Sequence, residues 1–150
     1  MISKVTNQVY IGDVNAAKAR LSEFGITRIL YLHEEPLSGV QDIPVVDRPI
    51  PDGRPISAET FDDFLAIMQG EIDNEGRVLV MCWAGMSRSA TVVLAYLVSQ
   101  GMGLREAYEH LRQQHPLTEP HTTLWQSLLD YTGLPHSMLD IMQWRIEGQA

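Results

Sequence analysis

The chain has 150 residues, enough for one compact domain with a single buried core. It carries 11 lysine and arginine residues against 19 aspartate and glutamate residues, so its net charge of −8 gives no positive surface for nucleic acid or anionic membranes. No apolar run approaches the ~20 residues that cross a bilayer, and the first residues lack a secretory signal pattern. We therefore expect one domain over residues 1–150, in the cytoplasm, without a nucleic-acid or membrane partner.

Short apolar segments alternate with helical patterns along the chain. In order, they are a strand at 9–11, a helix at 16–24, strands at 28–32 and 43–46, a helix from Ser57 to about Gly70, a strand at 77–81, and helices at 89–99, 104–113 and 122–131. Asn15 is the expected cap of the first helix and Gly25 its end. Prolines and a glycine exclude regular structure from 47–55. The alternation predicts an α/β fold, a three-layer sandwich with a central, mostly parallel sheet flanked by helices.

The last apolar segment, residues 137–147, has large apolar side chains on more than one face if it is helical. We expect it to pack against the domain. A helix that binds a partner is the alternative.

The only cysteine, Cys82, lies at the carboxyl end of the strand at 77–81, the edge of an open α/β sheet where ligands collect. A lone cysteine excludes an internal disulfide or a multi-thiolate metal site. The loop from Cys82 to Arg88 contains Gly85 and leads into the helix at 89–99, so backbone N–H groups can converge there on an oxyanion. Arg88 is placed to donate two hydrogen bonds to a phosphate-sized group. A buried core cysteine beside an unrelated arginine is the alternative.

The pattern Cys-x5-Arg-Ser within MCWAGMSRSATVVLAYL resembles the signature of the cysteine-based protein tyrosine phosphatases, and the wider stretch resembles their compact dual-specificity branch. VYIGDVNAA and GITRILYL are similar to that family's first strand, helix and second strand, and the resemblance extends to about Tyr131. It implies a phosphatase that needs no cofactor. The implied reaction removes phosphate from phosphotyrosine, and from phosphoserine or phosphothreonine, in proteins through a phosphocysteine intermediate.

The resemblance also implies roles for individual residues. Cys82 is the nucleophile, Arg88 binds the phosphoryl oxygens, and the Ser89 hydroxyl helps the thiolate leave. The phosphate-binding residues are Trp83, Ala84, Gly85, Met86, Ser87 and Arg88. Met81 stands where the family usually has histidine, and a thioether cannot make the polar contacts that would support a charged sulfur. The alternative function is therefore a catalytically weak or inactive phosphate-binding module.

An alkoxide or phenoxide leaving phosphorus needs a proton donor. Asp52, in the sequence Ile-Pro-Asp-Gly, resembles the general-acid loop of compact tyrosine phosphatases, and we favour it. Asp47 resembles the strand-end aspartate of other dual-specificity enzymes and remains the alternative. Either carboxylate could instead bond its own backbone in a turn. Arg48 and Arg54 flank this loop, where they would steer a phosphorylated substrate or lie solvated on the surface.

The five histidines share neither a helix face nor a paired ligand motif, so we expect no metal site and chance surface placement for most of them. They are His33, His110, His115, His121 and His136. His121 follows Pro120 where the family often has asparagine, and we place it outside the site. The loop after Cys82 has no lysine, which disfavours polyphosphorylated inositol lipids as substrates. The expected partner is a phosphorylated protein or a small phosphomonoester.

Overall fold

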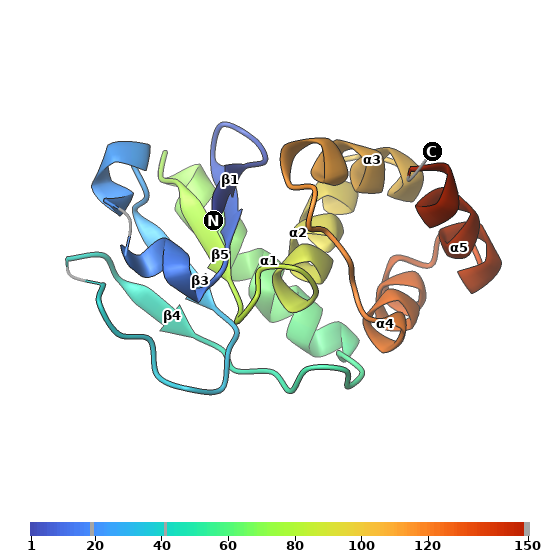
Figure 1. Cartoon of the computed structure of the whole chain (residues 1–150), viewed down its shortest axis with the longest axis horizontal. Coiled ribbons are helices and arrows are strands. Elements are labelled where there is room, and N and C mark those ends of the chain that lie inside the picture. Colours follow the sequence, from blue (N-terminus) through green and yellow to red (C-terminus); the bar gives the residue numbers. More distant parts are fainter. Residues whose placement is uncertain (19, 41, 149–150) are drawn as a thin grey trace.

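A computed structural model describes residues 1–18, 20–40 and 42–148. In these residues the central sheet has five strands, β1 (Ile2–Lys4), β2 (Val9–Gly12), β3 (Arg28–Tyr31), β4 (Val45–Asp47) and β5 (Val78–Met81). Their spatial order is β1-β2-β5-β3-β4, with β5 in the centre (Figure 1). β1 pairs antiparallel with β2, and all other neighbours are parallel. The mostly parallel sheet of the predicted α/β fold is confirmed, and β1 is an addition to it.

The helices follow the predicted order with one correction. They are the 3₁₀ helices η1 (Val14–Lys18) and η2 (Leu21–Phe24), and the α-helices α1 (Ala58–Asp73), α2 (Arg88–Ser99), α3 (Leu104–Gln114), α4 (Thr122–Thr132) and α5 (Met138–Glu147). The continuous helix predicted over 16–24 is wrong, although its position 19 lies outside the described residues. Asp13, rather than Asn15, caps η1 by accepting the N–H of Ala16 at 3.1 Å. Gly25 ends η2 in the left-handed conformation, as predicted.

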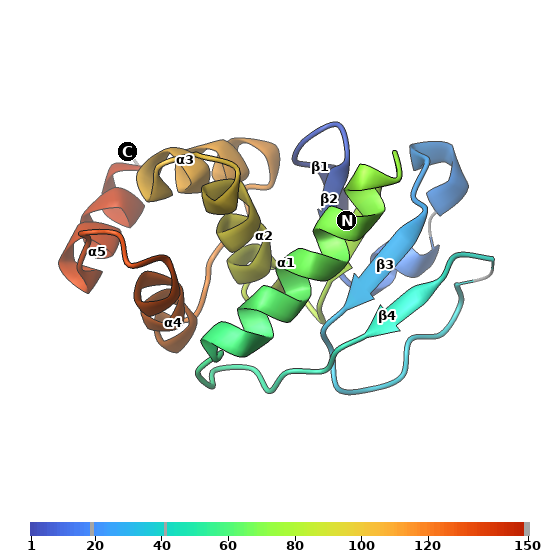
Figure 2. The ribbon, with the colours of Figure 1, turned by 180° about the vertical axis from the view of Figure 1, so that it is seen from behind.

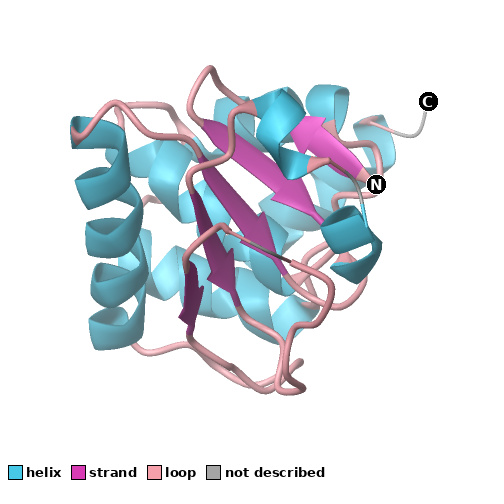
Figure 3. Cartoon of the chain, turned by 90° about the vertical axis from the view of Figure 1, so that its left-hand side faces the viewer, coloured by secondary structure: helices cyan, strands magenta, loops and turns pink. Residues whose placement is uncertain are grey.

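Successive side chains of each strand point to opposite faces of the sheet, and both faces are buried by the layers that cover them. One face packs against the α-helices, and α1 crosses in front of it in Figure 2. The other face, which includes Tyr10, Ile29 and Leu79, is covered by η1, η2 and partly buried side chains of the following loops. Figure 3 looks onto this second face, with the short helices in front of the strands. The predicted sandwich is confirmed, with 3₁₀ helices and loops forming its thinner layer.

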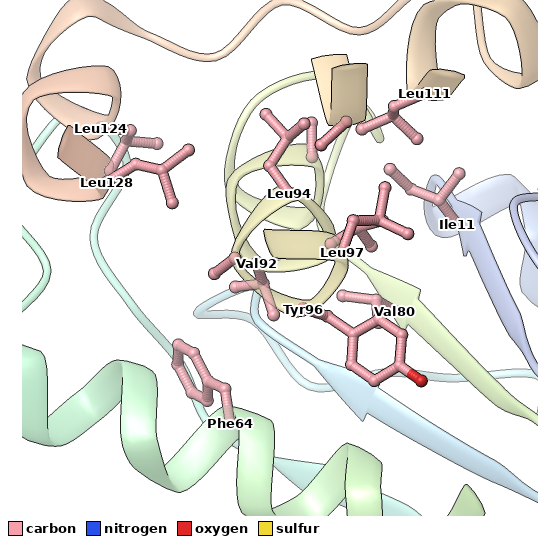
Figure 4. Close-up of a cluster of buried hydrophobic side chains, with 14 of the residues drawn as sticks. Ile11, Phe64, Val80, Val92, Leu94, Tyr96, Leu97, Leu111, Leu124 and Leu128 are labelled. Carbon is pink, nitrogen blue, oxygen red and sulfur yellow. The ribbon is translucent and has the colours of Figure 1, made fainter. Parts of the chain in front are cut away.

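The central helix of the domain is α2, in which residues 88–97 are all buried. Figure 4 shows its Val92, Leu94 and Leu97 among side chains from the sheet and from the surrounding helices. A helix that is apolar on all sides belongs in the interior of a protein. The first turn of α2, which follows the loop after β5, is therefore packed inside the domain.

Strand register brings three carboxyl ends to the same edge of the sheet. Gly12 of β2 and Tyr31 of β3 both pair with Met81 of β5. The residues that follow these strands therefore meet at one place, where a ligand of a parallel sheet is expected to bind.

The C-terminal helix α5 packs on the domain through Ile141 and Trp144, which are 0% and 5% exposed, as the sequence predicted. Its opposite side exposes Leu139, Met142 and Ile146 to solvent. None of the helices in the described ranges is both long enough and apolar enough to span a membrane.

Candidate active site

Cys82 directly follows β5 and is 2% exposed. Its Sγ lies 3.1 Å from the Oγ of Ser89 in the first turn of α2. A hydroxyl can donate a hydrogen bond to an ionised sulfur, so this contact suits a cysteine that works as a thiolate. The preceding residue, Met81, packs in the apolar cluster on the other face of the sheet, together with Tyr10 and Tyr31. Its thioether therefore lies on the opposite side of the strand from the Cys82 sulfur.

The loop between β5 and α2 is held through its carbonyl groups. The carbonyl of Trp83 accepts from Val14 N at 3.2 Å, that of Met86 from Glu119 N at 2.8 Å, and that of Gly85 from the His115 ring at 2.6 Å. Within the described part of the chain, the amide N–H groups of residues 83–87 donate to no other protein group. Free N–H groups in a loop that enters a helix N-terminus form an anion-binding cradle.

Gly85 allows this loop to pass close to the neighbouring strand. Its φ is +67°, in the left-handed region. A Cβ at this position would lie 2.9 Å from the carbonyl carbon of Gly12 at the end of β2. Because that neighbour is backbone, it cannot move aside cheaply, and any side chain here would distort the cradle.

Arg88 begins α2 and is 5% exposed. Its Nη1 donates to Glu34 Oε1 and to the Ile50 carbonyl, both at 2.9 Å. Its Nη2 lies 3.4 Å from His33 Nδ1. A guanidinium can only donate, so Nδ1 accepts and the His33 proton is on Nε2. Both N–H groups of Nη1 and one of Nη2 are therefore used in these bonds. The Nε–H and the second Nη2–H have no partner among the described residues.

These groups surround a pocket of about 680 Å³. Beyond Cys82 and the loop that follows it, the lining includes His33, Glu35, Asp52, Glu119, His121 and Arg145. At its mouth, Trp83 is 54% exposed and Met86 is 37% exposed. The Trp83 ring packs on His33, with ring centroids 5.0 Å apart. The pocket can therefore hold an apolar or aromatic group next to an oxyanion.

The two candidate acids occupy different surroundings. Asp52 lines the pocket, whereas Asp47, the last residue of β4, is not part of that lining. Asp52 belongs to a turn in which Gly53 has a φ of +73°. Arg48 binds the carboxylate of Asp63 at 2.9 Å, so it pairs with α1 next to this loop.

The histidines are more important to this site than the sequence suggested. His33 and His121 line the pocket, and His115, which is 1% exposed, forms a hydrogen bond with the Gly85 carbonyl. Chance surface placement is therefore wrong for these three, and placing His121 outside the site is corrected. The position of His33 just after the strand at 28–32 was a usable signal, because parallel strands end at a common edge. His115 and Arg145 carry no such local signal.

Comparison with known proteins identifies the family. Residues 9–133 match the family described as dual specificity phosphatase, catalytic domain. Human dual specificity protein phosphatase 21 is 33% identical over 137 residues, covering 86% of this chain and 70% of that protein. Mouse dual specificity protein phosphatase 15 is 30% identical over 134 residues, and the match covers 87% of this chain but 57% of the relative.

Solved structures show the same fold. The crystal structure of DUSP15 superposes with a TM-score of 0.80 at 30% identity, covering 87% of this chain and 86% of that one. A mouse putative dual specificity phosphatase complexed with zinc tungstate superposes with a TM-score of 0.81 at 26% identity, covering 95% and 91% of the two chains. The protein therefore belongs to the dual specificity phosphatase family and carries the catalytic domain of that class of cysteine-based protein phosphatase.

Proposed function

We propose that residues 1–150 form one active catalytic domain that hydrolyses phosphomonoesters in phosphorylated proteins, with phosphotyrosine as its first substrate and phosphoserine and phosphothreonine as further ones. The observation that carries this proposal is the state of Arg88. Its Nη1 is held by Glu34 and Ile50, while the Nε–H and one Nη2–H remain free on the side of the guanidinium. These two donors match two oxygens of a phosphoryl group.

In the first step the Cys82 thiolate attacks phosphorus and forms a sulfur–phosphorus bond. The bond from phosphorus to the ester oxygen breaks, and its electron pair goes to that oxygen. Asp52, on the wall of the same pocket, supplies the proton that makes the leaving group a neutral alcohol or phenol. The free loop N–H groups and Arg88 hold the oxygens on which negative charge develops.

In the second step water attacks the phosphocysteine, and the sulfur–phosphorus bond breaks with its electron pair returning to sulfur. The Asp52 carboxylate takes the proton from the water, and inorganic phosphate is released. Ser89 Oγ, 3.1 Å from Sγ, donates a hydrogen bond to the departing thiolate. This contact makes sulfur a better leaving group.

The substrate and the compartment are inferred from the pocket and from the thiol. Exposed Trp83 and Met86 at the pocket mouth suit contact with the aromatic ring of phosphotyrosine and with flanking peptide. A nucleophilic cysteine has to stay reduced, which favours the cytoplasm. The mouse neighbour of the same fold was crystallised in complex with zinc tungstate, which contains an oxyanion that resembles phosphate.

Purified protein assayed with para-nitrophenyl phosphate and a panel of phosphotyrosine, phosphoserine and phosphothreonine peptides tests the proposal. We expect turnover that is lost in Cys82→Ser. Tungstate binding without any turnover would overturn it in favour of an inactive phosphate-binding module.

A further inference from the structure

His121 connects two parts of the active site that are far apart in the sequence. Its backbone N–H donates to Ser87 Oγ at 2.9 Å, which ties it to residues 83–87, the proposed phosphate loop. Its ring Nδ1 accepts the backbone N–H of Thr123 at 3.2 Å and so caps α4. Because the Nδ1 lone pair is used in this way, the neutral ring carries its proton on Nε2.

The remaining edge of the ring lies beside the turn that carries Asp52. A methyl group placed on Gly53 would be 3.7 Å from His121 Cε1 and 3.8 Å from Nε2. Both His121 and Asp52 line the same pocket. The ring therefore stands beside the turn that presents the carboxyl group.

The turn itself has few other attachments. Ile50 N donates to the Leu32 carbonyl at 3.0 Å, and Ile56 N donates to Ser127 Oγ at 2.9 Å. Between these two anchors, no hydrogen bond joins residues 51–55 to another segment of the described chain. A contact from outside the turn is therefore needed to fix the position of the Asp52 carboxyl group.

We propose that His121 is a positioning residue that holds the Asp52 turn in register with the phosphate loop through its ring and its backbone. The inference rests on the proposed role of Asp52 as the general acid. In the first step a misplaced acid slows only the esters whose leaving group needs its proton, so the effect of His121 on that step depends on the leaving group.

The key variant is His121→Asn, because asparagine keeps an oxygen that can cap α4 but lacks the Cε1 and Nε2 atoms that lie beside Gly53. We compare kcat/KM, which reports only the steps up to the phosphocysteine, for phenyl phosphate, a poor leaving group, and 2,4-dinitrophenyl phosphate, a good one. We expect kcat/KM for phenyl phosphate to fall by about tenfold, a part of what general acid catalysis supplies, with kcat/KM for the dinitrophenyl ester nearly unchanged. His136→Asn, at a histidine outside the pocket, is the matched control and should behave as the unmodified protein.

The same measurement in an Asp52→Asn background separates positioning from a merely structural effect. There we expect His121→Asn to cause no further loss, because no acid remains to be positioned. Equal losses with both esters, or losses that multiply in the double variant, would overturn the inference. If Asp52→Asn is selective for the poor leaving group while His121→Asn is not, only the His121 inference fails. If Asp52→Asn itself is not selective, the proposed acid fails and the inference falls with it.

Discussion

The buried ring of His115 donates its Nε2–H to the Gly85 carbonyl at 2.6 Å and accepts the hydroxyl proton of Ser3 on Nδ1 at 2.7 Å. The acceptor nature of the carbonyl fixes this tautomer. Three separate segments are joined in this way, namely β1, the end of α3 and the phosphate loop. The contact holds the Gly85 carbonyl against the scaffold, and the amide N–H groups of residues 83–87 have no partner among the described residues.

This environment makes stability depend on pH. Burial lowers the pKa of His115, against the opposing effects of its bond to Gly85 and the charge of Asp13. In the unfolded chain the ring takes up a proton below its ordinary pKa of about 6.5, whereas in the folded protein it stays neutral to a lower pH. The folded state is therefore favoured most above pH 6.5, and the free energy of unfolding falls as the pH drops below that value.

Urea unfolding at pH 7.5 and pH 5.5, for the unmodified protein and for His115→Gln, tests this dependence. The variant should be less stable at pH 7.5 but should lose less stability on acidification. If His115→Gln loses as much stability on acidification as the unmodified protein, His115 is not the source of the pH dependence.

The sequence was informative where the chemistry is local. The apolar run that ends at Cys82, the glycine three residues later and the helix from Arg88 are contiguous, so their pattern predicts the cradle without knowledge of tertiary contacts. The parallel order of the elements likewise predicts at which edge the site lies.

The rest of the site comes from contacts between distant segments. His115 and Arg145 reach it from the end of α3 and from α5, and no periodicity indicates which loop a helix end will touch. β1 was missed because it has only three residues, none of them fully buried, and its pairing with β2 is what orders it. Asp13 replaced Asn15 as the cap for a similar reason, since the end of β2 decides which side chain faces the first free N–H groups.

Cys82→Ser tests the nucleophile separately from the anion site. The loop N–H groups and Arg88 do not depend on the sulfur, so vanadate or tungstate should still bind while turnover disappears. Calorimetry would measure binding, and para-nitrophenol release would measure turnover. Residual hydrolysis above the rate of a heat-inactivated sample would contradict the assignment of Cys82.

Ser89→Ala should affect the second step more than the first. A hydrogen bond to a charged group contributes about 1.5–3 kcal/mol, so losing the donor 3.1 Å from Sγ should slow release of the thiolate roughly tenfold or more. The phosphocysteine then accumulates, and stopped-flow measurements should show a burst of para-nitrophenol close to one per enzyme. A uniform decrease without a burst would assign Ser89 a role before the intermediate.

Arg88→Lys keeps the positive charge but loses the two parallel donors. Lysine also cannot bond Glu34 and the Ile50 carbonyl while presenting a fork to phosphate. We expect kcat/KM to fall by about a hundredfold or more, in line with the loss of a transition-state donor. Glu34→Gln, which weakens one anchor and leaves the fork intact, should cause a smaller decrease. Near-normal kinetics in Arg88→Lys would show that charge alone suffices.

The choice between Asp52 and Asp47 is tested by a series of aryl phosphates of graded phenol acidity. If Asp52 protonates the departing oxygen, the unmodified protein should be insensitive to leaving-group acidity, because the acid compensates for poor leaving groups. Asp52→Asn should make kcat/KM, which reports only the first step, depend steeply on that acidity, with a loss of about a hundredfold for phenyl phosphate and little for the most acidic phenol. Asp47→Asn should lower all rates by a small and equal factor, since Asp47 is outside the pocket lining. A steep dependence in Asp47→Asn, together with a flat one in Asp52→Asn, would exchange the two roles and place the leaving group at the end of β4.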